Sequence, residues 1–335
     1  MNLQKRIGSL VQLREYLLSE TEEWKQTKQK AYIHNKWFIP EFIDLAVHNI
    51  ADKFLSEENL RSLAKRYNVP EENEMKMVGI VPAGNIPLVG FHDILCTYLA
   101  GHHAAIKPSS KDEVLIKHLI DKLKETDKEN EAYFSYKDSL KGCDGYIATG
   151  SNNTSRYFEH YFGKYPHIIR RNRTSVAILT GNESTEDLRK LADDVMQYFG
   201  LGCRNVTKLY VPEGYDFMPL LHAFDRYKHL ADLNMYKNNY DYNLSLHILN
   251  KKYYMTNEVI VLVEDPAIFS PISQLHYEYY SDKEKLKRDI ENNTSIQCVV
   301  GENGVAFGEA QCPEIDTYAD GVDTMEFLVQ LGTNN

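Results

Sequence analysis

A cysteine flanked by glycines is the residue of this chain best suited to chemistry. Cys203 follows Gly200 and Gly202, between a helix expected over Ser184–Phe199 and a strand expected over Lys208–Val211. Glycine lets the backbone bend where a Cβ would clash, so a thiol on such a turn can approach a bound substrate closely. A thiolate there could act as a nucleophile, although a lone cysteine is more often a small buried hydrophobe.

The helix expected before Cys203 buries one of its sides. Its apolar residues recur at spacings of three and four, which is typical of an amphipathic helix. Ser184 followed by Asp187 resembles a capping box at its start. The sequence therefore predicts that Cys203 lies on a turn between two packed elements. The apolar residues are Leu188, Leu191, Ala192, Val195, Met196 and Phe199.

Composition and charge bound the class of protein. The chain has 335 residues, of which 43% are hydrophobic, enough for two globular domains and a sizeable core. A formal net charge of −10 argues against nucleic acid or an anionic membrane as the main partner. A basic cluster at Arg170, Arg171 and Arg173 could still bind an anionic ligand.

The cysteines and the hydropathy pattern indicate a reducing compartment, which we take to be the cytoplasm. Their number is odd, no CxxC pair occurs, and no His/Cys cluster has the spacing of a zinc site, so we expect no metal. The N-terminus lacks the long apolar region of a secretory signal. No apolar stretch approaches the roughly 20 residues of a membrane span. The cysteines are Cys96, Cys143, Cys203, Cys298 and Cys312.

The sequence pattern divides the chain into four segments. Residues 1–74 are charged and largely helical in pattern. Residues 75–173 alternate between strand and helix, and residues 174–303 begin a second alternating segment that carries Cys203. Residues 304–335 close the chain. Alternation of this kind predicts an α/β fold of parallel βαβ units, with ligands at the carboxyl ends of the strands.

The second segment lacks the two familiar nucleotide signatures. There is no GxGxxG after its first strand and no GxxxxGK[ST]. Residues 147–151 (IATGS) offer another route, since they close a strand with Gly150 and a helix N-cap at Ser151. The free N–H groups at a helix start favour a pyrophosphate, although serine at such a position is more often only a cap.

Taken in order, six segments resemble the aldehyde dehydrogenase superfamily and, within it, the LuxC-like acyl-CoA reductases. They are VPAGNIP (81–87), IKPSS (106–110), ATGS (148–151), the helix leading to GLGC (200–203), IFSPI (268–272) and FGEAQCPEIDTYADGVDTMEFL (307–328). The resemblance runs from about Asn35 to Leu331. It implies a parallel Rossmann-type cofactor domain over 75–173, on which residues 1–74 pack, and a second α/β domain over 174–303 for catalysis.

The resemblance assigns catalytic roles to two residues. Cys203 would be the thiolate that accepts the acyl group. Asn85 would donate its side-chain amide to the carbonyl oxygen, with the Cys203 backbone N–H as the second donor. Each such donor is typically worth about 2.7–4 kcal/mol in the transition state. The alternative for Asn85 is an amide that satisfies local backbone groups before Pro87.

The resemblance also implies a nicotinamide cofactor, bound by Pro82, Lys107, Ser110, Gly150 and Ser151. Lys107 would bond the adenosine ribose, and Gly150 with Ser151 would meet the pyrophosphate. Ser110 replaces an acid that often follows the lysine-proline pair. A carboxylate there would repel a 2′-phosphate, so we expect NADPH, with NADH possible.

Departures from the superfamily pattern indicate the direction of the reaction. Oxidising members use a glutamate to activate the water that hydrolyses the acyl-enzyme, and Arg170 stands at or near that position here. A reductase needs no such water. Ala267 stands where the EIFGP-type motif has its acid, which leaves the usual contact to the nicotinamide ribose in doubt. We therefore expect NADPH-dependent reduction of a fatty acyl-CoA thioester to an aldehyde through a Cys203 acyl-enzyme.

The sequence leaves two alternatives to this function open, and it also predicts how the chain assembles. The acyl donor could be an acyl phosphate or an acyl carrier protein, or the chain could be a non-catalytic subunit that docks an acyl-activating enzyme. In the resembled superfamily the C-terminal region joins a strand of one subunit to its neighbour. We therefore expect a homodimer whose contact includes the edge of Met325–Leu331; docking of that segment onto its own chain is the alternative.

Overall fold

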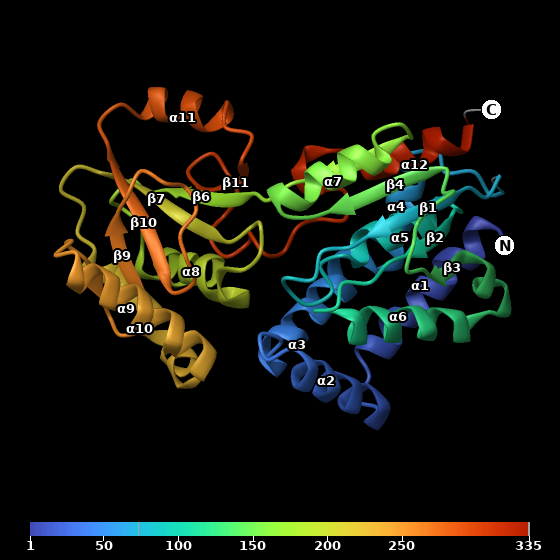
Figure 1. Ribbon diagram of the computed structural model, residues 1–335, viewed down its shortest axis with the longest axis horizontal. Coiled ribbons are helices and arrows are strands. Elements are labelled where there is room, and N and C mark those ends of the chain that lie inside the picture. The colour runs from blue at the N-terminus through green and yellow to red at the C-terminus, as the bar shows by residue number, and fades with distance from the viewer. Residues whose placement is uncertain (73, 334–335) are drawn as a thin grey trace. The chain divides into compact units, whose positions relative to one another are not determined.

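The computed structural model describes residues 1–72 and 74–333, which form two compact units (Figure 1). Unit 1 comprises Met1–Asn172 and Pro313–Asn335, and unit 2 comprises Arg173–Cys312. Each unit contains a sheet with helices packed on it, so the predicted α/β class is confirmed. The assignment of separate functions to the four predicted segments stays a prediction.

Unit 1 is built on a five-stranded sheet, called sheet A. Its strands are β1 (Met77–Val81), β2 (His103–Ile106), β3 (Phe134–Tyr136), β4 (Gly145–Thr149) and β5 (His167–Arg170). All pairs are parallel, in the order β3-β2-β1-β4-β5. The order reverses at β1, because β2 and β3 follow on one side of it and β4 and β5 on the other. Such a switch point creates a crevice at the carboxyl ends of β1 and β4.

Helices cover both faces of sheet A. They are α1 (Leu3–Leu17), α2 (Glu22–His34), α3 (Pro40–Asn49), α4 (Glu57–Arg66), α5 (Phe91–Leu99), α6 (Glu113–Thr126), α7 (Asn152–Phe162) and α12 (Thr324–Thr333). In Figure 1, α7 lies on one side of the sheet and α6 on the other. The ring of Tyr146 on β4 stacks on Phe162 of α7, with centroids 4.2 Å apart. Its neighbour Ile147 points to the opposite core, as the alternation of a strand requires.

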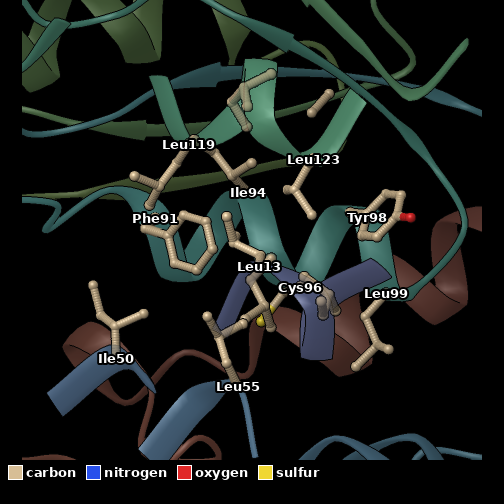
Figure 2. Packing of buried hydrophobic residues seen from close by; sticks show 14 of the residues in the cluster. Leu13, Ile50, Leu55, Phe91, Ile94, Cys96, Tyr98, Leu99, Leu119 and Leu123 are labelled. Carbon is tan, nitrogen blue, oxygen red and sulfur yellow. The ribbon is translucent and has the colours of Figure 1, made fainter. Parts of the chain in front are cut away.

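The main core of unit 1 surrounds α5, which is buried on nearly all sides. Figure 2 shows Ile94 and Tyr98 of α5 beside Leu119 and Leu123 of α6, with Leu13 of α1 on the other side. Each such side chain contributes about 1.5–3 kcal/mol when fully buried. This packing fixes the loop between β1 and α5, in which Asn85 lies.

Unit 2 is built on a six-stranded sheet, called sheet B. Its strands are β6 (Thr174–Ile178), β7 (Val206–Pro212), β8 (Met255–Thr256), β9 (Val261–Glu264), β10 (Gln274–Tyr280) and β11 (Ile296–Gly301). The order is β11-β6-β7-β10-β9-β8, and β8 pairs antiparallel while the other pairs are parallel. Its helices are α8 (Thr185–Met196), α9 (Met218–Ala223), α10 (Asn234–Leu249) and α11 (Lys283–Glu291).

The expected helix before Cys203 forms α8, and its capping box is confirmed. The Ser184 hydroxyl accepts from the Asp187 N–H and the Asp187 carboxylate accepts from the Ser184 N–H. The helix ends at Met196, however, and not at Phe199. The chain leaves the helix at Gln197, whose ψ of 141° is extended, and Tyr198 and Phe199 then adopt left-handed φ of 53° and 57°.

The closing segment is a helix that docks within its own chain. Met325 and Leu328 of α12 have no exposed surface and belong to the core around α5. A helix satisfies its own backbone groups, so the expectation that this segment pairs through a strand edge is wrong. The homodimer itself stays a prediction.

No helix within the described part of the chain is both long and apolar enough to cross a membrane.

Candidate active site

The predicted cofactor residues and Asn85 gather at the carboxyl edge of sheet A. Asn85 follows β1, Lys107 and Ser110 follow β2, and Gly150 with Ser151 follow β4. These three strands are neighbours in the parallel sheet, so residues separated by up to one-fifth of the chain reach one edge. This edge includes the switch point, where open α/β sheets bind their ligands.

Close packing shapes the loop that carries Asn85. Pro82 is buried, and a Cβ on Gly90 would lie only 2.2 Å from the Pro82 Cβ, so only glycine fits there. Leu88 adopts φ of 58°, which a leucine rarely does unless its surroundings hold it. Asn85 itself is half-buried. Pro82 therefore packs within the loop, and its contact with the cofactor stays a prediction.

The loop after β2 presents Lys107 and Ser110 to solvent. Both residues are exposed, and the Lys107 N–H continues the sheet by donating to the Ile80 carbonyl at 2.9 Å. The His34 Nε2–H at the end of α2 donates to the Ser110 carbonyl at 2.7 Å. The backbone of this loop is thereby held while the two side chains remain accessible.

The start of α7 has the features of an anion site. Ser151 is the N-cap residue, and its hydroxyl accepts from the Thr154 N–H at 3.3 Å. A Cβ on Gly150 would lie 3.0 Å from Thr154 and from Phe158, so the missing side chain lets the backbone approach the helix. The first N–H groups of a helix point outward and carry the positive end of its dipole. A pyrophosphate fits this arrangement.

In unit 2, Cys203 lies on a tight turn at the amino end of β7, and it is half-exposed. The turn is closed by Asn205, whose side chain is fully buried. Its Oδ1 accepts from the Gly202 N–H at 2.8 Å. Its Nδ2 donates to the carbonyls of Asp194 and Gln197 at the end of α8, at 3.0 and 2.9 Å. The turn is therefore fastened to α8 on one side and to sheet B on the other.

Ser175 of β6 contacts the same turn and a second thiol. Its hydroxyl lies 3.1 Å from the Cys203 carbonyl oxygen and 3.0 Å from the Cys298 Sγ. Burial raises the pKa of Cys298, and the contacts with Ser175 and Arg204 only partly offset it. Cys203 and Cys298 are thus both partly exposed thiols beside the same turn, and burial disfavours the thiolate form of Cys298.

Asp194 holds another part of unit 2 against α8. Its fully buried carboxylate accepts from the Gly308 N–H at 2.7 Å and the Ala310 N–H at 3.0 Å. Burial raises its pKa to about 7, although the two N–H groups act in the opposite direction. One residue of α8 thus contacts the segment 307–312 through its side chain and Asn205 through its carbonyl.

Arg170 does not belong to a ligand-binding basic cluster. The residue is only 3% exposed, and its guanidinium donates to the Asp93 carboxylate at 2.5 Å and to the Thr324 hydroxyl at 2.7 Å. Arg171 is exposed and pairs with Glu159. The expectation that these arginines meet an anionic ligand is wrong for Arg170, which joins β5, α5 and α12.

Three polar residues that the sequence did not single out hold the loop at 265–268. Thr207 donates to the Ile268 carbonyl at 2.6 Å, His276 Nδ1–H donates to the Ala267 carbonyl at 2.8 Å, and Lys208 donates to the Asp265 carbonyl. The signals that could have found them are two adjacent polar residues inside the apolar strand β7 and the alternating polar residues of β10. Ala267 is thus fixed through its backbone, in a position where the resembled motif has an acid.

Comparison with known families gives a match over residues 66–219, to the family described as acyl-CoA reductase (LuxC). The chain resembles the LuxC acyl-CoA reductases. Every predicted site residue, from Pro82 to Cys203, lies inside the matched segment. The match confirms the resemblance drawn from the motif order, and it ends before the segments at 268–272 and 307–328.

Solved structures show that this acyl-CoA reductase-like chain has the aldehyde dehydrogenase fold. Aldehyde dehydrogenase 21 from Physcomitrella patens, in complex with succinate, aligns with a TM-score of 0.70 at 13% identity, over 99% of this chain and 85% of its own. The Mycobacterium tuberculosis aldehyde dehydrogenase with NAD+ gives 0.66 at 12%, over 90% and 73%. The Streptococcus pyogenes succinic semialdehyde dehydrogenase with NADP+ gives 0.63 at 12%, over 89% and 76%. Identities this low establish the fold alone.

No curated protein sequence matches this chain. The described residues also contain no group of three or more His, Cys, Asp or Glu side chains that could hold a metal ion. The roles of the site residues therefore rest on their placement and on the family resemblance.

Proposed function

We propose that this protein is an acyl-CoA reductase that uses NADPH to reduce a fatty acyl thioester to an aldehyde through an acyl-enzyme on Cys203. The observation that carries the proposal is the match of residues 66–219 to the acyl-CoA reductases, which includes Cys203 on its fastened turn. The aldehyde dehydrogenase fold supports an oxidoreductase of this type.

The carboxyl edge of sheet A fits a nicotinamide dinucleotide. The start of α7 offers backbone N–H groups and a glycine for the pyrophosphate, and Lys107 is exposed for the ribose. Ser110 is exposed on the same loop and brings no negative charge, which supports acceptance of a 2′-phosphate. When bound, the reduced cofactor supplies the hydride that converts the acyl-enzyme into the aldehyde.

The chain's own residues carry the acyl transfer. The Cys203 thiolate attacks the thioester carbonyl, a carbon–sulfur bond to Cys203 forms, and the CoA thiolate leaves. One thioester replaces another, so the transfer is close to isoergic. Asn85 donates its amide to the carbonyl oxygen as negative charge develops there, which lowers the barrier to attack.

The environment of Arg170 supports reduction over hydrolysis. The side chain at or near the superfamily's general-base position is a buried guanidinium, and the carboxylate next to it, Asp93, is already ion-paired. An ion-paired, buried carboxylate is a poor base for water, since its protonation would break the pair. The acyl-enzyme is therefore protected from hydrolysis and available for reduction.

Intact mass spectrometry of the protein with acyl donors tests this function. We expect an adduct of one acyl group with acyl-CoA, and its loss in Cys203→Ala. Cys143→Ala, which removes a buried thiol of unit 1, is the matched control and should acylate normally. Acyl phosphate and acyl carrier protein are tested in parallel. Faster acylation by either of them than by acyl-CoA would identify it as the donor.

Two results would contradict the proposal. An adduct that persists in Cys203→Ala and maps to another cysteine would assign the nucleophile elsewhere. A wild-type protein that no donor acylates, and that does not change the fluorescence of NADPH or NADH, would indicate a non-catalytic subunit.

A further inference from the structure

Two loops at the carboxyl edge of sheet A pack directly on each other. One is the loop at 82–90 that carries Asn85, and the other is the loop at 107–112 that carries Lys107 and Ser110. A Cβ on Gly84 would lie 2.3 Å from the Ser109 Oγ and 3.4 Å from the Asp112 Cβ. The backbone of the first loop therefore approaches the second as closely as glycine allows.

Asp112 makes the hydrogen bond that joins the two loops. Its Oδ2 accepts from the Leu88 N–H at 2.7 Å, and the residue is only 2% exposed. Its Oδ1 has no hydrogen-bond partner among the residues at 1–72 and 74–333. Asp112 precedes α6, but its side chain does not cap that helix. The hydrogen bond from the Leu88 N–H is thus the structural role of this buried carboxyl group.

The residue that Asp112 holds is in a strained conformation. Leu88 adopts a φ of 58°, a region that costs a residue with a Cβ about 1–3 kcal/mol and persists only where the surroundings enforce it. The Phe91 N–H donates to the Leu88 carbonyl at 2.9 Å, so the bent loop leads directly into α5. Without a bond to its N–H, Leu88 would relax and the loop bearing Asn85 would move with it.

We propose that Asp112 is a positioning residue, which holds the Asn85 loop in its catalytic conformation and couples it to the loop that binds the cofactor ribose. The inference rests on the proposed role of Asn85. Burial raises the pKa of Asp112 well above its ordinary value, and the Leu88 N–H offsets this only in part. Asparagine has nearly the same shape and keeps an accepting oxygen, so Asp112→Asn preserves the bond to the Leu88 N–H.

Hydrogen exchange of the loop tests the inference without reference to activity. Asp112→Ser keeps a residue that favours a helix start but is too short to reach Leu88. We expect faster exchange in peptides covering 84–91 in this variant and wild-type exchange in Asp112→Asn. Asp144→Ser is the matched control, because Asp144 bonds the Met77 N–H at the other end of β1, at 2.7 Å. Wild-type exchange in Asp112→Ser would overturn the inference.

A double-mutant cycle with Asn85→Ala tests whether Asp112 affects catalysis through Asn85. We expect Asp112→Ser to lower kcat by about tenfold to a hundredfold, the scale of a small misplacement, with little change in the KM of the acyl donor. In the Asn85→Ala background the same change should cost less than about twofold, because the donor it positions is gone.

The cycle separates this inference from the proposed function. Effects that multiply fully would show that Asp112 does not act through Asn85, and a normal Asp112→Ser enzyme would show the same. A normal Asn85→Ala enzyme would remove Asn85 from the mechanism, and a wild type that no donor acylates would refute the proposed function. In either of the last two cases hydrogen exchange still decides whether Asp112 holds the loop.

Discussion

Asn205 illustrates how one side chain can fix the turn that carries a candidate nucleophile. Its amide joins the Gly202 N–H to carbonyls at the end of α8, and its own carbonyl accepts from the Ser175 N–H of β6 at 3.0 Å. The sequence does not predict this role, because a single asparagine two positions after a cysteine belongs to no periodic pattern or motif. The turn itself was predictable from its glycines, whereas its fastening was not.

Asn85 is the residue whose chemical role is most directly testable. Replacing it with alanine removes one donor to the developing oxyanion, and we expect kcat to fall by roughly a hundredfold or more. Its side chain is only half-buried at the end of β1, so the melting temperature should change little. Steady-state kinetics with acyl-CoA, together with thermal denaturation, measures both. Near-normal turnover would exclude the amide from catalysis.

The predictability of each element follows from the pattern that builds it. The runs at 77–81, 103–106 and 145–149 are short and apolar because each is buried in a parallel sheet, and this pattern predicts strands. The tyrosine-rich stretch after residue 234 lacks the usual aliphatic pattern of a helix, because α10 buries Tyr236, Tyr240, Asn243 and His247. The early end of α8 has no signal in the sequence, because the apolar spacing continues to Phe199 while the backbone becomes extended at Gln197.

The loop after β2 determines the choice of cofactor in our proposal. Ser110 is exposed on it, and its backbone is already held by His34, so a side-chain change there should leave the loop intact. Ser110→Glu places a negative charge where a 2′-phosphate would bind, and we expect it to weaken NADPH binding more than NADH binding. Fluorescence titration with both cofactors measures this. Equal losses would show that Ser110 does not face the ribose.

The contact between α8 and the segment 307–312 should depend on pH through Asp194. Its pKa of about 7 lies above the ordinary value of 3.8, so between these values the folded protein keeps a proton that the unfolded chain releases. The stability that the folded protein gains from holding this proton is complete below about pH 4 and is lost as pH rises through 7. Asp194→Asn cannot titrate, and its single oxygen satisfies only one of the two N–H groups, which should cost about 1–3 kcal/mol.

Urea denaturation at several pH values checks this behaviour. The free energy of unfolding should be lower in Asp194→Asn, and the gap to the wild type should narrow as pH rises from about 5 to about 8. A constant gap would mean that the carboxyl group titrates normally in the folded protein. The comparison uses the difference between the two proteins, so titration of other groups cancels.

The two units illustrate different limits of inference from fold. In unit 1, the rule that ligands bind at the carboxyl edge of a parallel sheet already brings Asn85, Lys107 and Ser151 together from their order in the chain. In unit 2, Cys203 precedes β7 and therefore lies at the amino edge of its sheet. The rule does not predict a ligand site at that edge. The proposal that Cys203 is the nucleophile depends instead on its glycine turn and on the family resemblance. General topology predicts a ligand-binding edge in unit 1, whereas it gives no such prediction for the turn in unit 2.

The burial of α12 changes what the predicted homodimer should look like. Leu328 has no exposed surface within its own unit, so Leu328→Ala should cost about 2–5 kcal/mol of stability and leave the assembly unchanged. A chain ending at Asp320 would uncover the apolar surface around α5 and should lose the folded state of unit 1, not only a partner contact.

We expect light scattering to report a dimer for both the full chain and Leu328→Ala, with a lower melting temperature for the variant. A full-length monomer would refute the homodimer. Dissociation of Leu328→Ala at an unchanged melting temperature would show instead that α12 contacts a second subunit.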